Sequence, residues 1–154
     1  MLGANDGIVS TAALILGVAG ATGARAPILL AGSVGLLAGA MSMGVGEYVS
    51  VSAQRDAERA LGHSPDGLVN PAQASVASFV SFVLGAAIPL VGVLISTTAW
   101  ITVIAVTVAL TITGAVSSRL GRAPARRAVI RNVVGGLVAM AVTFGLGSLV
   151  GRLF

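Results

Sequence analysis

The sequence contains no cysteine and few charged side chains. The absence of cysteine excludes disulfide-stapled secreted scaffolds, thiolate metal sites and thiol redox chemistry. Charged residues make up 9% of the 154 residues, whereas a soluble domain carries about 25% because its surface faces water. The composition is instead 56% hydrophobic, with a mean hydropathy of +1.00. These values exclude a soluble enzyme and a disordered chain, and they predict an integral membrane protein.

Five apolar stretches are long enough to cross a bilayer, which takes roughly 20 residues in a helix. Helices are expected because every backbone polar group within lipid must be satisfied inside the protein. The predicted fold class is therefore all-α, a single transmembrane bundle over residues 1–154. The expected helices cover about 7–24, 27–49 with an extension to 60, 72–95, 100–116 and 129–149. Residues 61–71 are expected to form a short loop between the second and third helices.

The arginines indicate which side of the membrane each connection faces. With five spans, seven of the nine arginines fall on the side of the N-terminus, and they are Arg55, Arg59, Arg119, Arg122, Arg126, Arg127 and Arg131. Positive charge accumulates on the cytoplasmic side, so the N-terminus is predicted to be cytoplasmic. The net charge of +4 comes from arginines that lie beside the membrane, where anionic lipid headgroups attract them. Nucleic acid is therefore not an expected partner.

Glycine is abundant, with 21 residues in the chain. In the second span, Gly35, Gly39 and Gly44 recur at spacings of four to five residues. Small residues at such spacing are typical of helices that approach closely in lipid. We expect this face to pack against the first helix or against a second copy of the chain.

Two carboxylates, Asp6 and Glu47, lie inside or at the edge of the expected spans. Ionisable groups within a membrane are costly and often mark a transport pathway. Both acids could instead lie at headgroup depth, where Asp6 would simply favour the start of the first helix. The neighbours of Glu47 support a functional interpretation, because four residues spaced four apart share one helix face, namely Gly35, Gly39, Met43 and Glu47.

A thioether beside a carboxylate suits a borderline divalent ion such as Fe²⁺, whereas carboxylates alone suit Mn²⁺, Mg²⁺ or Ca²⁺. Met43 could also serve only as a packing residue, which is the commoner role of methionine. Weaker metal-binding candidates are Met41 on a different face, Asp56 and Glu58 beside arginines at a solvated helix end, and the single histidine, His63. The chain lacks a Ser/His/Asp or Cys/His set, so it is not expected to be an enzyme.

Two segments carry a family resemblance: residues 2–11 (LGANDGIVST) and residues 37–56 (LAGAMSMGVGEYVSVSAQRD). With these motifs the chain closely resembles the vacuolar iron transporter family over nearly its whole length. The resemblance implies a five-helix protomer with a cytoplasmic N-terminus that works as a homodimer. It also implies export of Fe²⁺, and sometimes Mn²⁺, from the cytosol in exchange for protons. In such proteins the residues matching Asp6 and Met43 line the path at the dimer interface.

Two features depart from the family's pattern. Many members carry a glutamate-rich metal-binding domain between the second and third helices, where this chain has only residues 61–71. The chain therefore resembles a short form that lacks the cytoplasmic domain. Some plant members also carry a glutamate two turns before the methionine, where this chain has Gly35.

The leading hypothesis is a proton-coupled exporter of Fe²⁺, with Mn²⁺ as a second candidate cargo. Asp6 would bind either a proton or the metal ion, Met43 would supply a soft ligand, and Glu47 would gather ions at the cytoplasmic mouth. No permanently bound cofactor is expected, because the metal is the cargo. Two alternatives stay open, a non-transporting membrane scaffold and an uncoupled metal or proton channel. Without the basic start of a cleavable signal, the chain suits a bacterial inner membrane or a vacuole-type membrane equally.

Overall fold

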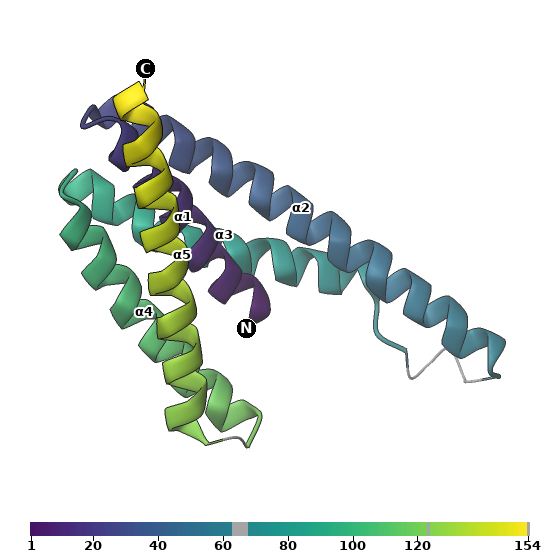
Figure 1. Cartoon of the computed structure of the whole chain (residues 1–154). Helices are drawn as coiled ribbons and strands as arrows, with labels where there is room; N and C mark the ends of the chain where they lie inside the picture. The colour runs from purple at the N-terminus through teal and green to yellow at the C-terminus, as the bar shows by residue number, and fades with distance from the viewer. Residues whose placement is uncertain (63–67, 123, 154) are drawn as a thin grey trace.

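The computed structural model describes residues 1–62, 68–122 and 124–153. These residues form five helices and no strand, which confirms the all-α prediction (Figure 1). The helices are α1 (Leu2–Ala21), α2 (Arg25–Ala60), α3 (Pro71–Ile95), α4 (Ala99–Leu120) and α5 (Ala125–Leu153). Each helix contains a stretch that is long and apolar enough to cross a membrane, as the hydropathy of the sequence predicts.

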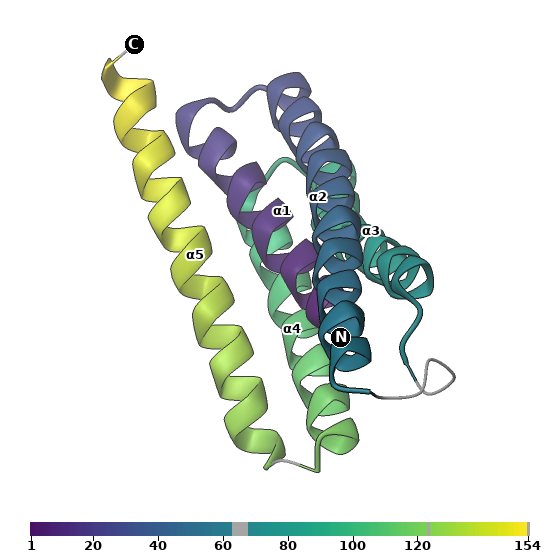
Figure 2. The same cartoon turned by 90° about the vertical axis from the view of Figure 1, so that its right-hand side faces the viewer.

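The five helices alternate in direction, so their ends gather at two sides of the bundle. In Figures 1 and 2, the N-terminus lies on the same side as the end of α2 and the α4–α5 connection, whereas the C-terminus lies beside the α1–α2 connection. The seven arginines of the predicted cytoplasmic side all lie within two turns of helix ends on the N-terminal side. On the opposite side, Arg25 donates a hydrogen bond of 2.5 Å to the carbonyl oxygen of Leu94, in the last turn of α3.

Three helices differ in their bounds from the ranges that hydropathy predicts. Helix α1 begins at Leu2 and ends at Ala21 instead of covering 7–24. The helices α4 and α5 both extend about four residues further into the polar N-terminal side than the predicted 100–116 and 129–149. Hydropathy detects the part of a helix that lies in lipid, whereas backbone hydrogen bonding continues through polar residues beyond it. The early start of α1 places Asp6 inside the helix rather than ahead of it.

Helix α1 is the centre of the bundle, since it contacts each of the other four helices. Its buried face joins two apolar clusters. The first cluster contains Ile8, Ala12, Leu16, Val106, Ala109, Leu110 and Met140, and the second contains Ile15, Ile28 and Val93. The first cluster joins α1 to α4 and α5, and the second joins α1 to α2 and α3.

Glycines bring the backbones of α1, α3 and α5 into direct contact. A Cβ atom at Gly85 of α3 would lie 2.9 Å from the carbonyl carbon of Ala4, and one at Gly147 of α5 would lie 2.8 Å from that of Gly17. Neither position has room for a side chain, so α1 is held between α3 and α5 by close backbone packing. These contacts were not evident from the spacing of glycines, which points to α2 instead.

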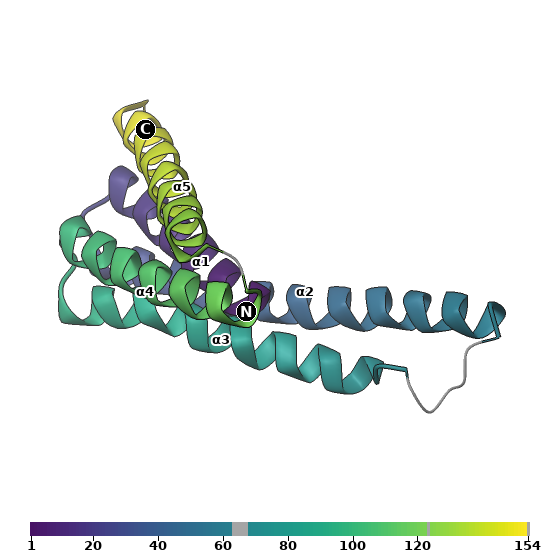
Figure 3. The same ribbon diagram turned by 90° about the horizontal axis from the view of Figure 1, so that it is seen from below.

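Two glycines of α2 contact side chains of neighbouring helices. Gly39 lies against the ring of Phe82 in α3, and Gly35 lies against a side chain of α1. The carbonyl oxygen of Gly44 accepts a hydrogen bond of 2.7 Å from the Ser75 hydroxyl of α3. Figure 3 shows the second half of α2 running beside the start of α3, beyond the other helices. The α2 glycines therefore shape the space between α1, α2 and α3.

Helices α2 and α5 have the smallest buried share of their apolar windows. Only 22% of the apolar window of α2 and 11% of that of α5 is buried, compared with 39% for α1. A helix that is apolar on its uncovered face requires lipid or another protein surface. These two helices flank the exposed face of α1 that carries Asp6.

Candidate functional site

Asp6 lies where two cavities meet. The first cavity has a volume of about 400 Å³ and is formed by α1, α2 and α3. The second cavity, of about 550 Å³, is formed by α1, α2 and α5. Asp6 and Met43 line both cavities. The two residues therefore form the junction through which an ion could reach either cavity.

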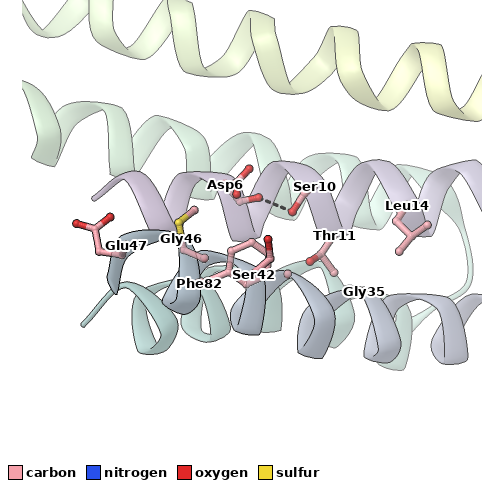
Figure 4. A pocket seen from close by; sticks show the side chains of 11 residues that line it. Asp6, Ser10, Thr11, Leu14, Gly35, Ser42, Gly46, Glu47 and Phe82 are labelled. Carbon is pink, nitrogen blue, oxygen red and sulfur yellow. Dashed lines mark hydrogen bonds between the residues drawn. The ribbon is translucent and has the colours of Figure 1, made fainter. Parts of the chain in front are cut away.

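The first cavity is lined by three helices (Figure 4). Its lining residues are Asp6, Ser10, Thr11 and Leu14 of α1, Gly35, Gly39, Ser42, Met43, Gly46 and Glu47 of α2, and Phe82 of α3. Figure 4 shows an order along the helices, with Glu47 at one end, Asp6 and Ser10 next, then Thr11, and Leu14 at the other end. The polarity of the lining thus changes from carboxylate to hydroxyl to hydrocarbon along the cavity.

The helix face inferred from the sequence around Met43 lines this cavity. Gly35, Gly39, Met43 and Glu47 all belong to it. Met43 and Glu47 are half-buried, as expected for side chains that border an open cavity. Met41 lies on another side of α2, is 56% exposed and lines neither cavity. The structure therefore separates the two methionines that the sequence left as candidates.

The two carboxylates of the first cavity are available to a cation. In the described part of the chain, no arginine lies within 4.0 Å of the carboxylate of Asp6 or of Glu47. Ser10 donates its hydroxyl hydrogen to the backbone carbonyl oxygen of Asp6, at 2.7 Å, and leaves the carboxylate unengaged (Figure 4). An unpaired acid in a membrane-spanning helix is costly and points to a functional role.

Hydroxyl groups are the part of this site that sequence reasoning missed. Thr11 is 1% exposed, and its Oγ1 has no hydrogen-bond partner among the described residues. Ser10 and Ser42 are exposed to the same cavity from α1 and α2. The sequence does contain a signal for these hydroxyl groups, because Ser10 and Thr11 follow Asp6 by about one helical turn and therefore lie next to it along the same helix.

The second cavity brings polar residues of α5 close to Asp6. Arg131 and Asn132 line it together with Asn5, Asp6 and Met43. The Oδ1 atom of Asn5 is buried without a hydrogen-bond partner in the described structure. In the sequence, Arg131 indicates only the membrane topology. In the structure, the residue lines a cavity that is shared with the candidate site.

The weaker candidates lie elsewhere. Asp56 forms an ion pair with Arg59, with 3.9 Å between the charged atoms, near the exposed end of α2. Glu58 accepts a hydrogen bond of 2.9 Å from Gln54 on the same helix. Neither acid lines the two cavities at Asp6. His63 lies outside the described residues.

A single chain offers a sparse set of metal ligands. Two carboxylates and one thioether line the first cavity, and the described residues contain no group of three histidine, cysteine or acidic side chains close enough to hold a metal ion. A stable structural metal site usually has four or more protein ligands. The arrangement suits a cation that is bound weakly in passage.

Comparison with known proteins shows which family this chain is similar to. A model of the VIT family matches residues 1–65 and 59–148. Vacuolar iron transporter homolog 5 of Oryza sativa subsp. japonica is 44% identical over 158 residues, which cover 95% of this chain and 76% of the relative. Vacuolar iron transporter homolog 4 of Arabidopsis thaliana is 41% identical over 98% of this chain and 82% of its own length. VIT-like transporter 1b of Glycine max is 36% identical over 98% of this chain and 74% of its own length.

These matches extend across all five helices, and they confirm the resemblance indicated by the segments around Asp6 and Met43. With the five membrane-spanning helices, they identify the chain as a multi-pass membrane protein that belongs to the VIT family.

Proposed function

We propose that this protein exports Fe²⁺, with Mn²⁺ as a second cargo, from the cytosol across a vacuole-type membrane in exchange for protons. The observation that carries the proposal is the cavity in which Asp6, Met43 and Glu47 converge within the membrane-spanning helices. The relatives from Oryza sativa subsp. japonica and Arabidopsis thaliana are named as vacuolar iron transporter homologs. The thioether of Met43 beside carboxylates is the ligand combination that suits Fe²⁺.

Each residue has a role that follows from its place along the cavity. Glu47 lies toward the arginine-rich end of α2, where the positive-inside rule places the cytosol. We therefore assign Glu47 to ion entry and Asp6 with Met43 to binding at the junction of the cavities. A carboxylate accepts either a proton or a divalent cation, so competition at Asp6 would couple the two fluxes.

The incomplete ligand set favours a homodimer. On α1, the residues Leu2, Asp6, Ser10 and Leu14 form an exposed stripe between α2 and α5. A second copy placed on this stripe by two-fold symmetry would bring its own carboxylate and thioether to the same place. It would also cover the apolar surface that α2 leaves exposed. We infer that two chains share one ion path.

Proteoliposomes that contain an Fe²⁺-sensitive dye and a pH-sensitive dye test this function. The parent protein should move metal with an opposite movement of protons. Asp6→Asn keeps the shape of the side chain but removes its charge, so it should abolish coupled flux while the protein stays folded. Met43→Leu should slow transport because a soft ligand is lost at similar volume. Met41→Leu is the matched control and should behave like the parent.

The possible results separate the candidate functions. Full coupled flux in Asp6→Asn would overturn the proposed coupling mechanism and leave Glu47 as the next acid to test. Metal flux without proton movement in the parent would indicate an uncoupled channel. A folded parent that moves neither metal nor protons would indicate a scaffold protein.

A further inference from the structure

Among the described residues, Thr11 is the one whose hydroxyl oxygen is fully buried without a hydrogen-bond partner. Thr107, Thr143 and Ser148 donate hydrogen bonds of 2.8 to 3.0 Å to a carbonyl oxygen four residues earlier in their own helix. This is the usual way in which a hydroxyl is satisfied in a helix. Thr11 is 1% exposed, yet its Oγ1 has no partner among the described residues. Such a buried and unsatisfied group is rare in native proteins and requires an explanation.

The position of Thr11 supplies that explanation. The residue lines the first cavity, five residues after Asp6 and three before Leu14. Figure 4 shows its side chain on the side of α1 that faces α2, between Ser10 and Leu14. Five residues correspond to about 7.5 Å along a helix, at a rise of 1.5 Å per residue. Thr11 therefore lies one turn further into the membrane than the acid.

Two more hydroxyl groups border the same part of the cavity. Ser10 uses its hydrogen on the carbonyl oxygen of Asp6, so its oxygen lone pairs are free to bind a cation or to accept from water. Ser42 faces the cavity from α2. On α2, Gly35 and Gly39 also line this stretch and contribute no side chain that could block it. The result is a neutral, oxygen-lined segment that follows the charged one.

We propose that Thr11, together with Ser10 and Ser42, forms a second station that receives the divalent cation after it leaves Asp6 and Met43; the inference rests on the proposed function. Hydroxyl oxygens can replace part of the hydration shell or accept hydrogen bonds from the waters that stay on the ion. The station is uncharged and binds weakly. Conduction through a path is favoured by several weak sites in succession, because the ion must be able to leave each site as well as enter it.

The isosteric variant Thr11→Val distinguishes this role from a structural one. Removal of a buried hydroxyl that has no partner should leave the fold as stable as before or more stable. Removal of an ion ligand should at the same time lower transport. We expect an unchanged or higher melting temperature in detergent, together with about a tenfold lower maximal rate of Mn²⁺ uptake into proteoliposomes. Thr11→Ser, which retains the hydroxyl, should restore most of the rate.

Thr107→Val is the control, because its hydroxyl donates to Val103 and lines neither cavity. A Thr11→Val protein that is folded and transports Mn²⁺ at the parental rate would contradict the proposal of a second station. If Thr11→Val fails to fold, Ser42→Ala takes its place as the test, and an unchanged maximal rate of Mn²⁺ uptake in that variant would contradict the proposal equally. Asp6→Asn is measured in parallel. Loss of transport in Asp6→Asn with full transport in Thr11→Val leaves the proposed function intact and removes only the second station.

Discussion

The ring of Phe82 in α3 occupies the space that a side chain at Gly39 in α2 would fill. A Cβ atom at position 39 would lie 2.7 Å from Cε1 of the ring and closer still to Cζ. Phe82 is 2% exposed and lines the first cavity together with Gly39. The pair therefore sets the distance between α2 and α3 one helical turn before Met43. The glycine thus affects both the packing of the helices and the shape of the site.

Gly39→Leu should destabilise the protein, because the leucine would force the buried ring of Phe82 out of its present position and into the cavity. Overpacking of this kind costs about 1–3 kcal/mol or more. We expect a lower melting temperature in detergent and a reduced yield of folded protein. Gly145→Leu in α5 is the control, since a Cβ atom at Gly145 has no neighbour within 4 Å. Equal stability of the two variants would contradict the importance of the contact with Phe82.

Gly147→Ala should be damaging even though only one methyl group is added. The Cβ atom would lie 2.8 Å from the carbonyl carbon of Gly17, and backbone cannot turn aside as a flexible side chain can. Helix α5 would have to move away from α1, with an expected loss of about 1–3 kcal/mol. Thermal unfolding followed by circular dichroism measures the change. Gly145→Ala, two residues earlier, should be neutral, and a neutral Gly147→Ala would mean that the two helices are not held this closely.

The fold and one half of the site could be predicted from local sequence patterns. Hydropathy predicts five helices because only the apolar core of each helix has to match the membrane, and the four-residue spacing of Met43 and Glu47 predicts that they share a face. The predicted ranges of α4 and α5 are too short, because both helices continue through polar residues that lie beyond their apolar stretch. Hydropathy by itself carries no information on where a helix stops outside lipid.

The other half of the site depends on tertiary contacts. Thr11 and Arg131 become site residues only because α1 packs between α2 and α5, and no periodicity within one helix indicates this. The backbone contact between Gly17 and Gly147 has the same origin, since the two glycines are far apart in the chain. The sequence correctly predicts that most arginines lie on one side of the bundle. That Arg131 also lines a cavity together with Asp6 depends on the arrangement of the helices.

Arg131→Gln should increase the apparent affinity for Mn²⁺. Arg131 lines the second cavity with Asp6 and Met43, and it lies in the first two turns of α5. A positive charge there repels a divalent cation at Asp6, although solvent and salt weaken the effect because Arg131 is exposed. Loss of the charge should lower the half-saturating Mn²⁺ concentration by about three- to tenfold at low ionic strength. Mn²⁺ uptake into proteoliposomes at several metal concentrations measures the shift.

Arg126→Gln is the matched control, because it removes the same charge from the same end of α5 but lines neither cavity. Both variants change the membrane surface potential alike, so any excess shift in Arg131→Gln reports the charge on the cavity wall. The excess should shrink at 1 M salt, where screening acts over about 3 Å. Equal half-saturating concentrations in the two variants would mean that the charge is not felt at Asp6. Loss of transport in Arg131→Gln alone would instead make the guanidinium part of the path, since repulsion cannot explain a residue that the flux requires.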